Sequence, residues 1–304
     1  MRQWMVFFVG LLMVVAGCAA ENGIVRRPVA FGSEADNVKI MTFNIRYGLA
    51  NDGADHWDAR RDGVFDRIAK QGADVVGVQE ALGFQMDQLG QALSGYKAVG
   101  VGRDDGKRAG EFCGIFYRKD RFTVADSGVF WFSNSPWTKG SMHWGNLIPR
   151  ICTWVRLVEK KTARAFYVYD VHFDHQSQVS RQKSAELLAQ RVAQREPKDP
   201  VVVLGDFNTD LDNPALLYLR RVGYADAPVE LLDTWRRLYP NEKETGTYHA
   251  FTGKADGGKI DHILTEPSTE VLDAQIDRTP IESGRYPSDH FPVTVVLKLW
   301  TSSK

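Results

Sequence analysis

The sequence has few cysteines, no excess of either charge sign and no zinc-binding signature. Its three cysteines show no CxxC spacing and no HExxH motif occurs, which excludes the common zinc signatures and gives no sign of a catalytic thiol. Lysine plus arginine and aspartate plus glutamate number 38 each. This balance produces no overall field that would steer nucleic acid or an anionic surface toward the protein, although a locally basic site is compatible with it.

The sequence also contains no linker that would divide the chain, and no internal repeat or low-complexity tract. A chain of 304 residues with 43% hydrophobic content can bury a large core, either as one large α/β domain or as two smaller ones. Because no segment divides the chain, we expect one domain over residues 37–300.

The N-terminus has the composition of a targeting sequence. A single arginine, Arg2, precedes an apolar run from Trp4 to Val15, and small residues follow. The apolar run is too short to span a bilayer comfortably. These residues therefore predict a cleaved signal rather than a part of the fold.

The string VAGC at residues 15–18 resembles the bacterial lipobox. The resemblance implies cleavage before Cys18 and attachment of lipid to its sulfur. We therefore predict a lipoprotein signal peptide over residues 1–17 and a tether over 18–36. The protein would be anchored by lipid on the periplasmic side of a bacterial membrane or at the cell surface. A plain signal peptide with a chance cysteine is the alternative.

The other two cysteines, Cys113 and Cys152, lie in segments with strand-like patterns. In an oxidising compartment they would be able to pair, whereas two buried thiols fit the same sequence, because free cysteine is among the most buried residue types. The sequence leaves both alternatives open.

The stretch VVVLGDFNTD at residues 201–210 joins an apolar run to polar chemistry. Its four leading apolar residues predict a strand that is buried on both faces. Gly205 then allows close approach of the backbone. Asp206 and Asn208 are two residues apart, so in an extended chain they would project to the same side. An ordinary strand-to-turn transition, which favours the same residue types, is the alternative.

Hydrophobic periodicity predicts many strands and several helices. Strands are expected at residues 38–44, 75–80, 97–101, 111–117, 122–132, 151–158, 164–172, 201–208, 247–251, 260–265, 271–276 and 293–299. Helices are expected at residues 57–71, 82–93, 177–195 and from 213 to Gly223, the last with Asn213 as N-cap and Pro214 at its first position. Because helix 177–195 lies between two predicted strands, it would form the crossover of a βαβ unit.

The segment at residues 133–150 has no clean period but contains Trp137, His143, Trp144 and Arg150. Two tryptophans with an arginine would form a stacking and phosphate-binding wall, since loops commonly carry recognition residues. The alternative is that the tryptophans pack the loop onto the core.

Polar residues stand at the ends of six predicted strands. An Asp beside a His next to apolar strand residues is costly unless the charges pair or bind metal. A lone carboxylate such as Glu80 would ordinarily be solvated. It is a candidate site residue only if the other polar strand ends lie close to it. The residues at the six ends are Asn44, Glu80, His172, Asp206 with Asn208, Asp261, and Asp289 with His290.

These strand ends belong to motifs that occur in one order along the chain: FNIR at 43–46, QE at 79–80, VHFDH at 171–175, GDFN at 205–208, KIDHIL at 259–264 and SDHFP at 288–292. The set resembles the endonuclease/exonuclease/phosphatase superfamily of Mg²⁺-dependent phosphoesterases, which includes pancreatic deoxyribonuclease. The resemblance implies an α/β fold, a four-layer sandwich of two packed mixed β-sheets flanked by helices. Its site would lie at one end of the sheets.

The resemblance also implies a division of roles. Asn44, Glu80 and Asp289 would bind the divalent metal, directly or through water. Asp206 and Asn208 would orient and polarise the attacking water and the phosphoryl oxygen, and His172 would donate to the phosphate or the leaving group. His290 would act at the phosphate as a base or donor, with Asp261 holding it in one tautomer. Arg46 and Arg150 are candidate substrate contacts.

Carboxylate and amide oxygens without cysteine are hard ligands, which suits Mg²⁺, with Mn²⁺ or Ca²⁺ as alternatives. We therefore expect a monomeric, metal-dependent phosphoesterase that hydrolyses a phosphomonoester or phosphodiester. A small or lipid-linked phosphate is favoured, because no cluster of basic residues marks a long nucleic-acid track. The alternatives are an extracytoplasmic nuclease and a catalytically silent binding module of the same fold.

Overall fold

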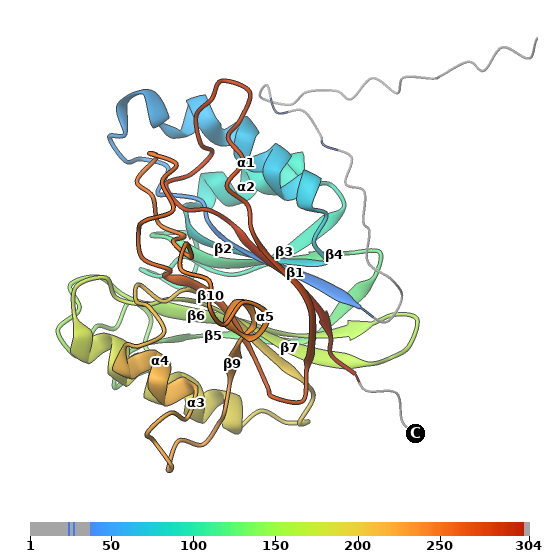
Figure 1. Ribbon diagram of the computed structural model, residues 1–304, viewed down its shortest axis with the longest axis vertical. Helices are drawn as coiled ribbons and strands as arrows, with labels where there is room; N and C mark the ends of the chain where they lie inside the picture. The colour runs from blue at the N-terminus through green and yellow to red at the C-terminus, as the bar shows by residue number, and fades with distance from the viewer. Residues whose placement is uncertain (1–23, 25–26, 28–36, 301–304) are drawn as a thin grey trace, which may run out of the picture.

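The computed structural model describes Ile24, Arg27 and residues 37–300, which form two six-stranded sheets packed face to face (Figure 1). The predicted signal peptide, Cys18 and most of the predicted tether lie outside the described residues. None of the described helices has both the length and the apolar character needed to cross a membrane.

The first sheet has the strand order β11-β12-β1-β2-β4-β3. Its strands are β1 (Val38–Asn44), β2 (Val75–Ala81), β3 (Tyr96–Val99), β4 (Phe112–Arg118), β11 (Glu270–Ile276) and β12 (Val293–Lys298). Only β1 and β2 pair in parallel, and helix α1 (Trp57–Gln71) connects them. Gly72 ends this helix in the left-handed conformation that glycine adopts readily.

The second sheet has the strand order β5-β6-β7-β8-β10-β9. Its strands are β5 (Phe122–Trp131), β6 (Ile151–Glu159), β7 (Ala165–His172), β8 (Val201–Asp206), β9 (Leu232–Asp233) and β10 (Asp261–Thr265). Here the parallel pair is β7 and β8. Helix α3 (Gln178–Ala193) connects them, which confirms the predicted βαβ crossover.

Helices cover the outer faces of the two sheets (Figure 1). Helices α1 and α2 (Gly83–Ala92) lie over the first sheet, and α3 and α4 (Pro214–Leu219) lie over the second. The short α5 (Thr234–Leu238) and a 3-10 turn at Gly53–Asp55 complete the helical elements of the described residues. The predicted four-layer α/β sandwich is therefore confirmed.

The hydrophobic core has three main layers. Side chains of α1 pack on the first sheet, with Ile68 and Phe43 in one buried cluster, and side chains of α3 and α4 pack on the second. Between the sheets lie fully buried residues such as Ile40 and Leu204. Strand β8 is buried on both faces, which explains why its first four residues are all apolar.

Several predicted boundaries differ from the structure. Residues 247–251 form no strand: Tyr248 makes one isolated bridge to His290, and Ala250 and Phe251 have positive φ angles that a strand cannot contain. Helix α4 (Pro214–Leu219) ends before Gly223, where it was predicted to end. Asn213 is its N-cap, as predicted, and its side chain accepts from Ala215 N. Strand β9 and helix α5 were not predicted, because two and five residues are too short for periodicity to register.

The cysteine question is settled in favour of buried thiols. Cys113 and Cys152 are both free and buried. Burial raises the pKa of each thiol well above its usual value, so neither is a nucleophile at neutral pH.

Candidate active site

Strand pairing places the predicted polar strand ends at a common edge. Asn44 pairs in register with Gln79 at the ends of β1 and β2, and His172 pairs with Asp206 at the ends of β7 and β8. Because each pair is parallel, its carboxyl ends emerge together. The antiparallel strand β10 begins at this edge, so that Asp261 lies opposite Asp206.

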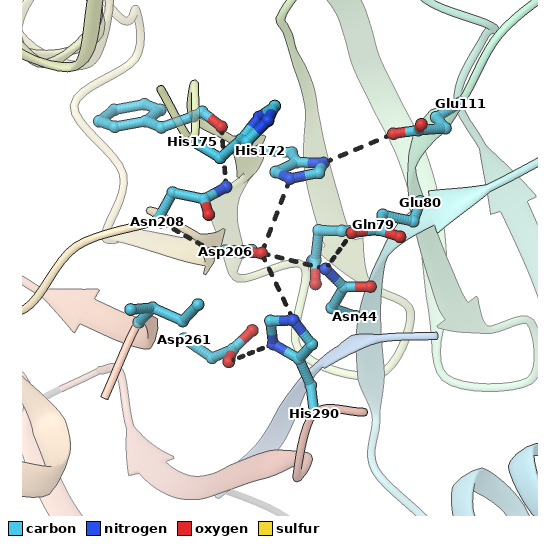
Figure 2. Close-up of polar contacts among 12 residues, drawn as sticks. Asn44, Gln79, Glu80, Glu111, His172, His175, Asp206, Asn208, Asp261 and His290 are labelled. Atoms are coloured by element: carbon cyan, nitrogen blue, oxygen red, sulfur yellow. Dashed lines mark hydrogen bonds and ion pairs between the residues drawn. The ribbon is translucent and has the colours of Figure 1, made fainter. Parts of the chain in front are cut away.

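These ends surround a cavity of about 420 Å³. Of the predicted site residues, eight line it: Arg46, Glu80, Arg150, His172, Asp206, Asn208, Asp289 and His290. Asn44 and Asp261 lie directly behind the lining, each hydrogen-bonded to residues that form it. The structure thus brings the predicted catalytic, metal and substrate residues among residues 37–300 to one place. Figure 2 shows seven of them: Asn44, Glu80, His172, Asp206, Asn208, Asp261 and His290.

His290 and Asp261 form a buried pair. The Nδ1 of His290 donates to Asp261 Oδ2 at 2.9 Å, which leaves Nε2 directed at Asp206 Oδ2, 4.0 Å away. Burial alone would lower the pKa of His290, but Asp261, Asp289 and Asp206 outweigh it and raise that pKa to about 10. His290 is therefore a protonated donor at neutral pH, held in one orientation by Asp261.

Asp261 and His290 are expected to act as one unit, because an Asp that orients a His has no task once the His is removed. We predict that the double variant Asp261→Asn with His290→Ala has a kcat/KM within about threefold of His290→Ala alone. The measurement is kcat/KM for both single variants and the double variant, with circular dichroism to confirm folding. Losses that multiply would show that the two residues work separately.

Asn44 joins two carboxylates across the two sheets. Its Nδ2 donates to Glu80 Oε1 at 2.9 Å and to Asp206 Oδ2 at 3.0 Å. The amide is fixed in this orientation because its Oδ1 accepts from Arg46 N at 2.9 Å. Burial and the charge of Asp261 raise the pKa of Asp206 to about 7. The Asn44 amide therefore links the carboxylates of Glu80 and Asp206. An uncharged donor does not neutralise their negative charge.

A backbone irregularity points Glu80 into the cavity. The register of β2 against β4 shifts between Val78 and Ala81, and Glu80 has a left-handed φ of 62°. A bulge of this kind re-aims a side chain next to a site. The Oε2 of Glu80 then accepts from Tyr47 N at 2.8 Å. The expectation that a lone strand-end Glu is simply solvated does not apply here.

The donor set fits a divalent cation. One potential ligand atom from each of Glu80, Asp206 and His290 lies within 4.8 Å of the others. Two carboxylates this close, Asp206 buried and Glu80 half-buried, are costly unless a cation balances them, and oxygen donors are those that Mg²⁺, Mn²⁺ and Ca²⁺ prefer. The carboxylates of Glu80 and Asp206 are the oxygen donors of this group, and His290, tied to Asp261 through Nδ1, has its Nε2 beside them.

His172 occupies the opposite side of Asp206 from His290 (Figure 2). Its Nε2 lies 3.6 Å from Asp206 Oδ2 and its Nδ1 lies 3.8 Å from Glu111 Oε2, distances too long for hydrogen bonds. Burial, with Arg150 and Arg103 nearby, holds the pKa of His172 well below its usual value. A protonated imidazole, His290, and a neutral one, His172, therefore lie on either side of Asp206.

The segment around Asn208 differs from its predicted form. Strand β8 ends at Asp206, and Asn208 has a left-handed φ of 52°, so the two side chains are not placed by an extended chain. Instead Asp206 Oδ1 accepts from Asn208 N at 2.8 Å, and Asn208 Nδ2 donates to Phe173 O at 3.0 Å. The local turn fixes both groups at the cavity by hydrogen bonds.

The loop at residues 133–150 contributes Ile148 and Arg150 to the cavity, but neither tryptophan. Trp137 is 64% exposed, and Trp144 packs against the core of the second sheet. The predicted stacking wall is thus wrong, and packing onto the core describes Trp144. Arg150 is buried and donates to Asp174 and to His175 Nδ1, the latter at 2.7 Å.

Sequence reasoning missed several lining residues, among them Arg103, Glu111, His175 and Tyr248. Arg103 and Glu111 form a bidentate pair with N–O distances of 2.6 and 2.8 Å. His175 stood in the VHFDH motif, which offered a signal for it. Nothing local distinguishes Arg103 or Glu111 from surface charges, because only the tertiary fold brings them to the cavity.

The model of the Endonuclease/Exonuclease/phosphatase family matches residues 41–290, so the chain belongs to this family. Its members hydrolyse phosphoester bonds and generally depend on a divalent metal. The resemblance of the sequence motifs to this family is thereby confirmed.

Individual proteins similar to this chain extend the comparison. A solved endonuclease/exonuclease/phosphatase from Bacteroides vulgatus is 33% identical, with a TM-score of 0.76, covering 87% of this chain and 99% of that one. A mannosyl-6-phosphatase from Bacteroides thetaiotaomicron is 30% identical, with a TM-score of 0.77 and coverage of 86% and 99%. An uncharacterized protein of Acanthamoeba polyphaga mimivirus is 25% identical over 276 residues, which are 86% of this chain and 100% of that protein.

Proposed function

We propose that the protein is a divalent-metal-dependent phosphoesterase that hydrolyses a small or lipid-linked phosphate ester by attack of an activated water. The observation that carries the proposal is the arrangement of Glu80, Asp206 and His290 within 4.8 Å at one cavity. Negative charge grows on the phosphoryl oxygens in the transition state. Two carboxylates that bind a cation, together with a protonated imidazole, would stabilise this charge.

The residues divide the work as their geometry allows. A bound Mg²⁺, or Mn²⁺ or Ca²⁺ in its place, would be held by Glu80 and Asp206 with Asn44 and Asp289 close by, and would neutralise charge on the phosphoryl group. Asp206, anchored through Oδ1 to Asn208 N, orients the attacking water and accepts its proton. The Asn208 amide is fixed beside it for a phosphoryl oxygen.

The two imidazoles take complementary parts. Protonated His290 donates through Nε2 to a phosphoryl oxygen, while Asp261 holds its ring in place. Neutral His172 donates a hydrogen bond, and not its proton, to the phosphate or to the departing oxygen from the other side of Asp206, and the departing oxygen takes up a proton from solvent. Arg46 and Arg150 provide positive charge in the cavity wall.

A small substrate is supported by the size of the cavity and by a relative. A volume of about 420 Å³ is in the range of small-molecule sites. The relative that is 30% identical over most of both chains is named a mannosyl-6-phosphatase. A sugar-sized phosphomonoester is therefore the substrate class that we favour.

The test is a substrate panel with the purified protein and Mg²⁺. It covers sugar and inositol monophosphates, sphingomyelin, bis-p-nitrophenyl phosphate, DNA and RNA, and measures released phosphate or cleaved product. We expect the highest kcat/KM with a small phosphomonoester. Faster cleavage of nucleic acid would favour the nuclease alternative, and no hydrolysis of any compound would favour a silent binding module.

We also propose that lipid on Cys18 anchors the protein on the periplasmic side of a bacterial membrane or at the cell surface. The support is the VAGC string at residues 15–18 after an apolar run. Because thioether lipidation requires that one sulfur, Cys18→Ser is predicted to release the protein from membranes or to leave an uncleaved precursor. The measurement is membrane fractionation with labelled fatty acid. Unchanged processing and labelling in the variant would overturn the lipoprotein assignment.

A further inference from the structure

Two residues of the predicted tether lie on the helical layer that covers the first sheet. Ile24 is buried in the cluster that α1 forms with that sheet. Arg27 N donates to Ala92 O, at the end of α2, at 2.8 Å. The Cζ of Arg27 lies 5.1 Å from the centre of the Phe65 ring on α1. The tether is therefore bound to α1 and α2 at these two points.

Two carboxylates of α1 hold the Arg27 side chain. Its Nε donates to Asp66 Oδ1 and its Nη2 donates to Asp62 Oδ1, both at 2.7 Å. An exposed ion pair contributes little by itself, but here two pairs act together with a backbone hydrogen bond and with the burial of Ile24. We call this set of interactions of Ile24 and Arg27 the tether contact.

The tether contact limits where a lipid on Cys18 can lie. Cys18 precedes Ile24 by six positions, and an extended chain of that length reaches at most about 22 Å. The two sheets pack about 10 Å apart and a helix is about 10 Å across, so the α3–α4 layer lies roughly 30 Å from the α1–α2 layer (Figure 1). The lipid would therefore hold the α1–α2 layer at a bilayer, and not the α3–α4 layer.

Exposed apolar side chains stand on the same layer, at the rim of the cavity. Leu49 follows the lining residue Tyr47 by two positions and is 68% exposed, and Phe84 in the first turn of α2 is 37% exposed. Gly48 lies against the Phe84 ring, since a Cβ added there would lie 2.8 Å from Phe84 Cζ. Gly48 N also donates to Gln85 Oε1 at 3.0 Å. Helix α2 thus carries the rim at its start and the tether contact at its end, about 12 Å away.

We infer that the α1–α2 face is the membrane-contact surface of the protein, on which Leu49 and Phe84 enter the lipid headgroup region and bring this side of the cavity rim to the bilayer. The inference rests on the proposed lipid anchor. A short tether keeps these side chains at a high effective concentration at the bilayer, so the burial of a few apolar groups suffices to set the orientation.

The experiment places a fluorescent probe at the rim of the full-length, lipidated protein. Leu49→Cys is labelled with a nitrobenzoxadiazole group, which does not reach the buried Cys113 and Cys152. Val222→Cys is the matched control, because Val222 is 48% exposed and follows α4 on the opposite layer. Phe84→Cys provides a second rim position that does not depend on the folding of Leu49→Cys.

The labelled proteins are reconstituted into vesicles of phosphatidylethanolamine and phosphatidylglycerol that contain a nitroxide-labelled lipid. We expect the nitroxide to quench the rim probes at least about threefold more strongly than the control probe.

A second arm loosens the tether contact without changing the tether. In the double variant Asp62→Asn with Asp66→Asn, the excess quenching at the rim should fall, and trypsin should cut after Arg26 at least about threefold faster than in the wild type. Asp58→Asn should behave as the wild type does, because Asp58 pairs with Arg61 on the same helix. Mass spectrometry of the N-terminal fragment measures the cleavage.

Equal quenching of rim and control probes in protein that carries the acyl label would overturn the inference. So would quenching and proteolysis that are unchanged in the double variant. A blue shift of the rim probe that grows with protein concentration without vesicles would assign this surface to a second copy of the chain. Absence of the acyl label from the wild type would overturn the proposed lipid anchor, and the inference with it.

Discussion

Glu80→Gln is expected to lower the hydrolysis rate by about 10² or more at low Mg²⁺, comparable to the loss of one electrostatic stabiliser, while the protein remains folded. The substitution keeps the shape of the side chain but removes the negative charge. It retains only one of the two accepted hydrogen bonds, from Asn44 Nδ2 or from Tyr47 N, because the amide nitrogen of glutamine cannot accept. Because Glu80 would be one of two carboxylates on the cation, the affinity for the cation should fall. Added Mg²⁺ or Mn²⁺ should therefore restore part of the rate.

The measurement for Glu80 is a metal titration of activity in wild type and variant, beside a thermal melt of each. Glu270→Gln is a matched control, since Glu270 lies on the edge strand β11 and, among the described residues, forms an ion pair only with the half-exposed Lys298. The control should leave both the rate and the metal midpoint unchanged. Identical metal midpoints and rates in Glu80→Gln would return Glu80 to an ordinary surface role and weaken the metal assignment.

Asp206→Asn is expected to reduce kcat by on the order of 10²–10⁴, the usual contribution of a positioned acid or base. Asparagine retains the size of the side chain but accepts no proton from water. Burial and Asp261 raise the pKa of Asp206 to about 7, and the base must be deprotonated to act. Activity should therefore rise with pH through this pKa, and a bound cation, which favours the carboxylate form, should move the rise to lower pH.

The alkaline side of the profile belongs to His290. Its pKa is raised to about 10 by Asp261, Asp289 and Asp206 against the effect of burial, and its protonated form is the donor. Activity should fall as the pH rises through this value, giving a bell-shaped dependence of kcat/KM. The measurement is the pH profile of wild type, Asp206→Asn and His290→Ala. An acidic limb that survives unchanged in Asp206→Asn would assign the base to another residue.

The strand-end residues were predictable because their signals are local. An apolar run that stops at a polar residue marks the end of a buried strand, and this pattern located His172 and Asp206 without any knowledge of the fold. Parallel pairing brings such ends together within each sheet, and the packing of the two sheets then brings Asn44 to Asp206. The fold class followed from the resemblance of these motifs, in their order along the chain, to a known family.

Other features of the site depend on tertiary structure that periodicity does not contain. Arg103 and Glu111 become cavity residues only through the hairpin that pairs them, and their sequence context is that of surface charges. The left-handed backbone of Glu80 and Asn208 overrides the extended geometry that a strand pattern suggests. Likewise, the segment 247–251 has apolar and aromatic residues typical of a strand, yet its positive φ angles make it a turn.

The central claim is that this cavity hydrolyses phosphate esters with a divalent cation, and chelation tests it most directly. The wild-type protein, freed of metal with EDTA and dialysed, is assayed for phosphate release from the best small phosphomonoester before and after Mg²⁺ is added back. The account predicts that activity is lost on chelation, returns with Mg²⁺, and fails to return in His290→Ala. Equal phosphate release with and without the cation, or in His290→Ala, would contradict it.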